Sequence, residues 1–165
     1  MREGVIKEDI IKKIFQFLES LPIPIQFSEI PTETFLPGIK IEKGTILVDA
    51  NKLTHPGDIL HEAGHIAVSI PEERIHLNNN VTENNTTKEG EELAAMLWSY
   101  AAILEMGLAA EIVFHPDGYK GESDWILNQY RNQVYIGLPL LQWMGLTYLD
   151  TEESSFPHMK KWLRE

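Results

Sequence analysis

The 165-residue sequence contains no cysteine. This excludes disulfide bonds, thiol nucleophiles and every zinc site that uses a cysteine ligand. Basic side chains are also few, since 14 Lys and Arg stand against 25 Asp and Glu, for a net charge of -11. A surface that binds nucleic acid or an anionic membrane needs an excess of Lys and Arg, so we expect neither partner. Any transition-metal site in this chain would have to use His and carboxylate side chains.

The sequence also lacks the long uncharged apolar run of a membrane span. Its longest apolar stretch, residues 93–114, is interrupted by Glu105 and Glu111, whereas a span needs about 20 residues with almost no charge. The first nine residues are mixed in charge and contain no apolar segment of the kind found in signal peptides. The length fits one domain, and 43% hydrophobic residues can form a core. We therefore expect a single soluble, cytoplasmic domain over residues 1–165.

The hydrophobic spacing predicts a mostly helical α+β fold with a small antiparallel sheet. A hairpin is expected over residues 39–49, with a further short strand at 25–27 and a polar, Asn-rich surface loop over 71–88. A capping-box pattern at 86–89 is expected to open a long helix. The helices are expected over 7–20, 58–69, 89–105, 124–134 and 137–144, with short ones from about 109 and from about 157.

The segment His61-Glu62-Ala63-Gly64-His65 carries the strongest chemical pattern in the chain. Residues four apart lie on the same face of a helix, so both imidazoles can reach one cation. Glu62 is rotated by about 100° from His61, which places its carboxylate beside a metal-activated water rather than on the metal. The apolar flanks indicate a buried helix. The pattern therefore predicts a Zn²⁺ site in which Glu62 is the general base.

A catalytic zinc ion usually has three protein ligands, and the next helix offers the third. The sequence GEELAAMLWS over residues 90–99 resembles the gluzincin metallopeptidases, in which a Glu on a following helix completes the HExxH site. In that clan the ligand Glu is commonly followed by a small residue three positions on and an aromatic residue six positions on. Glu92 fits this pattern, with Ala95 and Trp98, and Glu91 fits it less well. The remaining candidates for the third ligand are Glu89, Glu105, Glu111, His115 and Asp124.

The resemblance implies further features of the site. In several gluzincins an Asp or Asn four positions after the ligand Glu supports a histidine, but Met96 occupies that position here, so another group must orient the imidazoles. The clan also binds extended substrate along a strand edge, which would correspond to residues 45–49. Several phrases, among them PGDILHEAGH and YIGLPLLQWMG, are similar to small bacterial HExxH proteins of uncharacterised activity. That likeness spans most of the chain and supplies no substrate.

Hydrolysis of an amide also requires a donor for the developing oxyanion. The candidates are His115, Tyr119 and Tyr100, of which the first two share a turn. Asp124 is a candidate to hold a ligand imidazole, and His55 and His76 are expected to face solvent. The combined expectation is a zinc-dependent peptidase that acts on a peptide or protein. The alternative is a metal-binding sensor or interaction module with little or no turnover.

Overall fold

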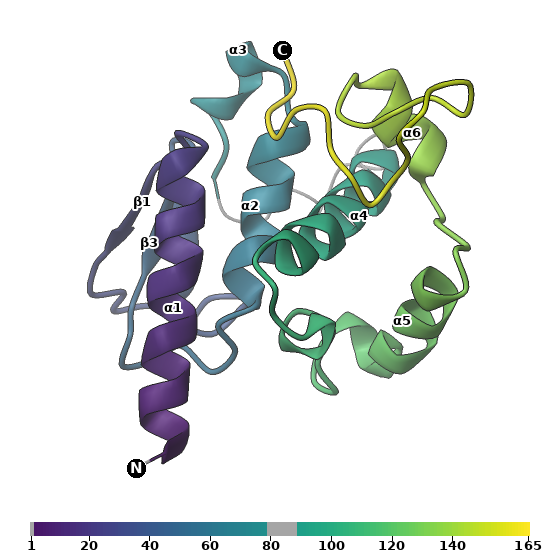
Figure 1. Ribbon diagram of the computed structural model, residues 1–165. Coiled ribbons are helices and arrows are strands. Elements are labelled where there is room, and N and C mark those ends of the chain that lie inside the picture. The colour runs from purple at the N-terminus through teal and green to yellow at the C-terminus, as the bar shows by residue number, and fades with distance from the viewer. Residues whose placement is uncertain (1, 79–88) are drawn as a thin grey trace.

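The computed structural model describes residues 2–78 and 89–165 and has the expected α+β architecture (Figure 1). Residues 86–88 of the expected capping box and much of the expected loop at 71–88 lie outside these ranges. The elements are α1 (Arg2–Ser20), β1 (Ile25–Phe27), β2 (Ile39–Glu42), β3 (Thr45–Val48), α2 (Asp58–Val68), α3 (Pro71–Arg74), α4 (Glu89–Glu105), the 3-10 turns η2 (Ala110–Ile112) and η3 (Tyr119–Gly121), α5 (Ser123–Arg131) and α6 (Leu138–Trp143).

The sheet has the strand order β1-β3-β2 and is mixed rather than purely antiparallel. The expected hairpin is present, since β2 and β3 pair antiparallel across a turn at Lys43 and Gly44. Both turn residues have positive φ, and a Cβ atom on Gly44 would lie 2.3 Å from the carbonyl oxygen of Arg74. The sheet is mixed because β1 lies along the other edge of β3, away from β2, and pairs with β3 in parallel.

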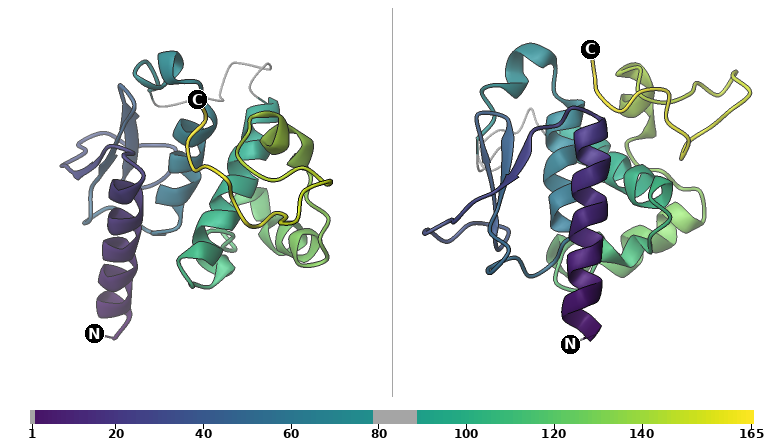
Figure 2. Two further views of the ribbon diagram at one scale, coloured as in Figure 1. Left: turned by 45° about the horizontal axis from the view of Figure 1, so that its top comes forward. Right: turned by 60° about the vertical axis from the view of Figure 1, so that its left-hand side comes forward.

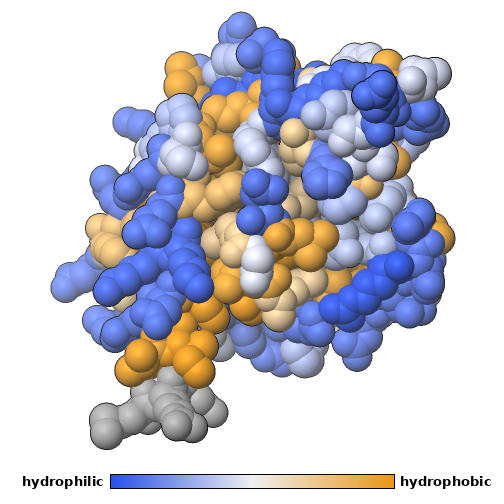
Figure 3. All heavy atoms as spheres, viewed as in Figure 1, coloured by the Kyte–Doolittle hydropathy of each residue, from blue (hydrophilic) through white to orange (hydrophobic). Residues whose placement is uncertain are grey.

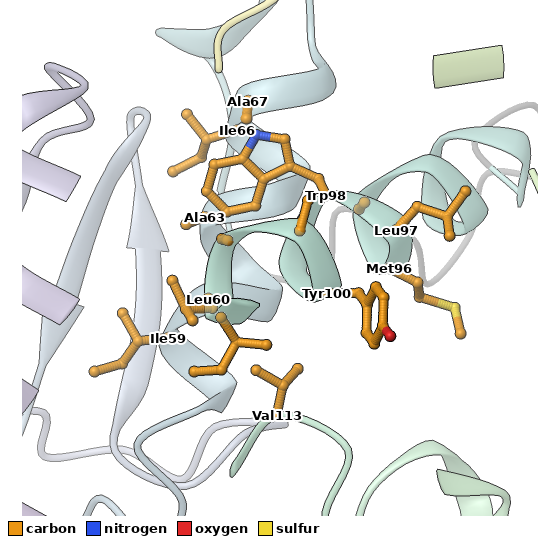
Figure 4. Packing of buried hydrophobic residues seen from close by; sticks show 14 of the residues in the cluster. Ile59, Leu60, Ala63, Ile66, Ala67, Met96, Leu97, Trp98, Tyr100 and Val113 are labelled. Carbon is orange, nitrogen blue, oxygen red and sulfur yellow. The ribbon is translucent and has the colours of Figure 1, made fainter. Parts of the chain in front are cut away.

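Helix α2 occupies the centre of the molecule, with α1 and the sheet on one side and α4 to α6 on the other (Figures 1 and 2). Its apolar side chains pack against α4, where the fully buried Trp98 lies near Ile66 and Ala67 (Figure 4). The two backbones approach closely at Gly64, since a Cβ atom there would lie 2.7 Å from the carbonyl oxygen of Ala95. This close approach brings the polar side chains of the two helices within reach of one another.

Two expectations about secondary structure are wrong. Residues 71–74 of the expected loop form the short helix α3. The tail after Pro157 is not helical, because its backbone pairs elsewhere: Met159 bridges Thr147, and the Arg164 N–H donates to the carbonyl oxygen of Ala67. The carbonyl oxygen of Trp162 also accepts a hydrogen bond of 2.9 Å from the Trp98 indole N–H. The tail is therefore held against α2 and α4 in an irregular, non-helical form.

The face in Figure 3 is hydrophilic along much of its rim, and apolar side chains gather through the middle of the face and near the N-terminal part of α1. Val5 and Ile6, which lie there, are more than half exposed. Within residues 2–78 and 89–165, no helix combines the length and the apolar character needed to cross a membrane.

Candidate metal centre

Helices α2 and α4 bring His61, His65 and Glu92 together at the centre of the molecule. One ligand atom from each residue lies within 4.8 Å of the others. The Nε2 atom of His65 is 2.7 Å from Oε2 of Glu92, and Nε2 of His61 is 3.5 Å from Oε1 of the same carboxylate. The three side chains therefore point at one common volume.

The spacing suits a zinc ion. Tetrahedral bonds of about 2.0–2.1 Å place neighbouring ligand atoms roughly 3.3 Å apart. The 3.5 Å from Nε2 of His61 to Oε1 of Glu92 is close to that value, whereas the 2.7 Å from Nε2 of His65 to Oε2 is a hydrogen-bond length that would widen when a metal enters. Oε2 of Glu92 is buried and has no hydrogen bond of normal geometry in the described parts of the chain, although His65 is close. A cation between the carboxylate and the two imidazoles would satisfy this buried oxygen.

The three side chains differ in their preferred protonation states, and His65 would have to lose a proton to bind a metal. Burial, helped by repulsion from His65, lowers the pKa of His61 to about 4, so this imidazole is neutral at pH 7. Burial also acts against the charge on His65 and on Glu92. Their mutual contact outweighs it, so that the pKa of His65 is raised and the pKa of Glu92 is lowered. The cluster therefore carries a carboxylate that needs a positive partner, which a proton or a metal ion can supply.

Glu62 follows the first histidine on α2 and is a partly buried carboxyl group. Burial raises its pKa to about 7, with further contributions from the negative charges of Glu92 and Asp58 and an opposing one from His65. A base with a pKa near neutrality is well matched to accepting and returning a proton at pH 7. The environment therefore fits the role that the sequence predicts for Glu62.

Tyr119 contacts the first histidine of the cluster. Its hydroxyl oxygen lies 2.8 Å from Nδ1 of His61, leaving Nε2 of that ring to face Glu92. The Tyr119 ring stacks on Phe114, with centroids 5.2 Å apart, and burial raises the pKa of its hydroxyl well above the usual value. The backbone has positive φ at both Tyr119 (51°) and Lys120 (56°), which non-glycine residues adopt only when the surroundings hold them. Tyr119 therefore orients the His61 imidazole, a task for which the sequence offered no residue at Met96.

The other predicted residues lie elsewhere. His115 is outside the cluster, because its Nε2 atom is 2.7 Å from Oδ1 of Asp58 and its ring stacks on His55. His55 is only partly exposed, which contradicts the expectation that it faces solvent. His76 is exposed, as expected. Tyr100 packs among aromatic rings, including Phe114.

The remaining candidates for the third ligand do not join the group. Among the described side chains, the cluster with His61 and His65 includes Glu92 but not Glu91. Glu105 and Asp124 are exposed, and Glu111 pairs with Arg131 at 2.6 Å. The side chain of Glu89 lies outside the described part of the structure.

The expected substrate-binding edge at residues 45–49 is absent. Strand β3 is the central strand, paired with β1 on one side and with β2 on the other. Its backbone hydrogen-bonding groups are therefore engaged within the sheet, and an extended peptide cannot add to it. The sequence could not show this, because the parallel pairing with β1 joins segments separated by a long irregular stretch.

No family model matches the chain, and the comparisons with curated proteins and with solved structures give no match either.

Proposed function

We propose that this protein is a zinc-dependent hydrolase that cleaves peptide bonds. The observation that carries the proposal is the convergence of His61, His65 and Glu92 on one volume, with Glu62 next to the first of them on α2. Two imidazoles and one carboxylate are the donor set of many catalytic zinc sites, and three protein ligands leave a position open for water or substrate. The choice of a peptide as substrate follows from the resemblance to the gluzincins.

In this proposal, each polar side chain has a defined task. A bound zinc ion would lower the pKa of a water molecule and polarise the substrate carbonyl. Glu62 takes a proton from the attacking water and gives it to the leaving amine as the C–N bond breaks. Tyr119 holds His61 in the orientation that turns Nε2 toward the cluster. The products are a carboxylic acid and an amine, so the water molecule is fully accounted for.

The test is the Glu62→Gln variant, assayed against a peptide library together with its zinc content. We expect the variant to keep its zinc and to lose activity by about 100-fold or more, since it has lost the proton acceptor. Glu105→Gln, on the exposed end of α4, is the matched control and should retain full activity. Equal rates for wild type and Glu62→Gln, with zinc bound to both, would contradict the mechanism.

One observation favours a second candidate function, a metal-dependent sensor or interaction module. The strand that the resemblance assigns to substrate is paired on both sides, which removes the usual mode of binding an extended peptide. A wild-type protein that binds zinc tightly, hydrolyses no member of the library and captures a ligand only in the presence of zinc would establish this alternative.

A further inference from the structure

A second cluster of possible metal ligands lies beside the first and is not used in the proposed hydrolysis. It consists of His55, His115 and Asp117, which each offer one ligand atom within 4.8 Å of the others. His55 lies in the loop before α2, and the other two lie in the turn between η2 and η3. Together the two clusters contain four of the six histidines in the chain.

The buried member of this second cluster has an unused nitrogen. His115 is 93% buried, as its exposed fraction is 7%, and its Nε2 atom lies 2.7 Å from Oδ1 of Asp58. When Asp58 is ionised, the proton of a neutral His115 ring sits on Nε2, and this N–H donates a hydrogen bond to the carboxylate. Nδ1 then keeps its lone pair. That Nδ1 atom is buried and has no hydrogen-bond partner among the residues that the structure describes. A buried acceptor of this kind needs a donor or a metal.

The other two members approach from the surface. Nε2 of His55 is 2.9 Å from Oδ2 of Asp117, and the His55 ring stacks on His115 with centroids 3.6 Å apart. The two rings are nearly parallel, with an angle of 11° between their planes, so the His55 ring must rotate before both imidazoles can direct a lone pair at one ion. The side chains of His55 and Asp117 are 25% and 75% exposed, which allows this adjustment and leaves a bound ion open to water. The Asp58 carboxylate behind His115 matches the carboxylate–histidine–metal arrangement that commonly orients a ligand imidazole.

We propose that His55, His115 and Asp117 bind a second divalent transition-metal ion, with Asp58 as the residue that positions His115. Two imidazole nitrogens and one carboxylate oxygen suit first-row ions such as Zn²⁺ or Co²⁺ better than Mg²⁺ or Ca²⁺. The site joins the loop before α2 to the turn that leads into Tyr119, two residues after Asp117. Because the Tyr119 hydroxyl contacts His61, the second ion would fix the segment that orients a ligand of the first.

The proposal is tested by the metal stoichiometry of the full chain after dialysis against Zn²⁺, measured by elemental analysis. We expect two ions per chain for wild type, one for His55→Ala or Asp117→Ala, and one for Glu92→Ala. His76→Ala, which removes an exposed histidine outside both clusters, should retain two. Both second-site variants change partly exposed side chains, so their folds should survive, and circular dichroism checks this.

The absorption spectrum of bound Co²⁺ supplies an independent measurement. In the Glu92→Ala background only the second site is filled, and Asp58→Asn should weaken its Co²⁺ affinity about 10–100-fold, since the orienting carboxylate is lost. A wild type that binds one ion, kept in both His55→Ala and Asp117→Ala, would overturn the second site. One ion that is lost in those variants and kept in Glu92→Ala would support the second site and contradict the first, so the two failures are distinguishable.

Discussion

The Nε2 atom of His65 lies 2.7 Å from Oε2 of Glu92, across the interface between α2 and α4. This contact links the two central helices through the side chains that we propose as zinc ligands. The polar cluster lies in the interface where α2 packs against α4. Metal binding to these side chains should therefore be coupled to the stability of the fold.

Zinc should accordingly stabilise the protein through this contact. At a free zinc concentration 100 times the dissociation constant, the free energy of unfolding should rise by about 2.7 kcal/mol. In a His55→Ala background, which removes a ligand of the second proposed site, Glu92→Ala should remove most of this increase because it deletes a ligand of the first site, whereas Glu105→Ala should leave it intact. Thermal unfolding with and without a chelator measures the effect. A zinc-dependent shift of the same size in Glu92→Ala on that background would show that zinc binds elsewhere.

The close approach of α2 and α4 at Gly64 gives a second prediction. A Cβ atom at this position would lie 2.7 Å from the backbone oxygen of Ala95, so Gly64→Ala must push the helices apart. We expect a loss of about 1–3 kcal/mol in the free energy of unfolding, together with weaker zinc binding. Gly4→Ala is the control, because Gly4 lies in α1 and a Cβ atom added there would have no heavy atom within 4 Å. That change should stabilise the helix by up to about 1 kcal/mol.

Tyr119 gives a third prediction through its hydroxyl contact with His61. Tyr119→Phe retains the ring that stacks on Phe114 and removes only the hydroxyl group. Because the imidazole then loses its orienting partner, zinc affinity should fall about 10–100-fold. Competition with a chromophoric chelator measures the affinity. Tyr148→Phe, at a residue that contacts Lys160, should leave it unchanged, and an unchanged affinity in Tyr119→Phe would remove the positioning role.

The sequence predicted the features that depend on local spacing. The hairpin of β2 and β3 and the extent of α2 follow from periodicity or short patterns within one or two elements. The choice of Glu92 over Glu91 came instead from the resemblance to the gluzincins, and it stays a prediction. Contacts made through irregular segments were not predictable in this way. The stacking of His55 on His115 joins two loops. The contact of Tyr119 with His61 depends on positive φ at Tyr119 and Lys120, which neither residue type predicts. The helix expected in the tail is absent for a related reason, since hydrogen bonds to Trp98 and Ala67, which are distant in sequence, hold the tail in an irregular form.

The last prediction concerns acid stability and the residue that follows β3. The Asp49 carboxylate accepts hydrogen bonds from the backbone N–H groups of Ile30, at 3.0 Å, and Asn51, at 3.1 Å. The Ile30 contact is the main cause that lowers the pKa of Asp49 below its ordinary value of 3.8, with smaller help from Asn51 and Lys52 against an opposing effect of burial. Because the pKa is lower in the folded state, the stabilisation is complete above that ordinary value. It is lost as the pH falls toward the folded-state pKa.

Asp49→Asn should therefore lower the free energy of unfolding at pH 7 and flatten its decline below about pH 4. Both effects can be measured by denaturant titrations at intervals of about one pH unit between about pH 2 and pH 7. A chelator should be present so that zinc release does not contribute. Asp9→Asn, on the exposed face of α1, is the control for the change in net charge. If Asp9→Asn and Asp49→Asn gave the same profile, overall charge rather than the bond to Ile30 would govern acid stability.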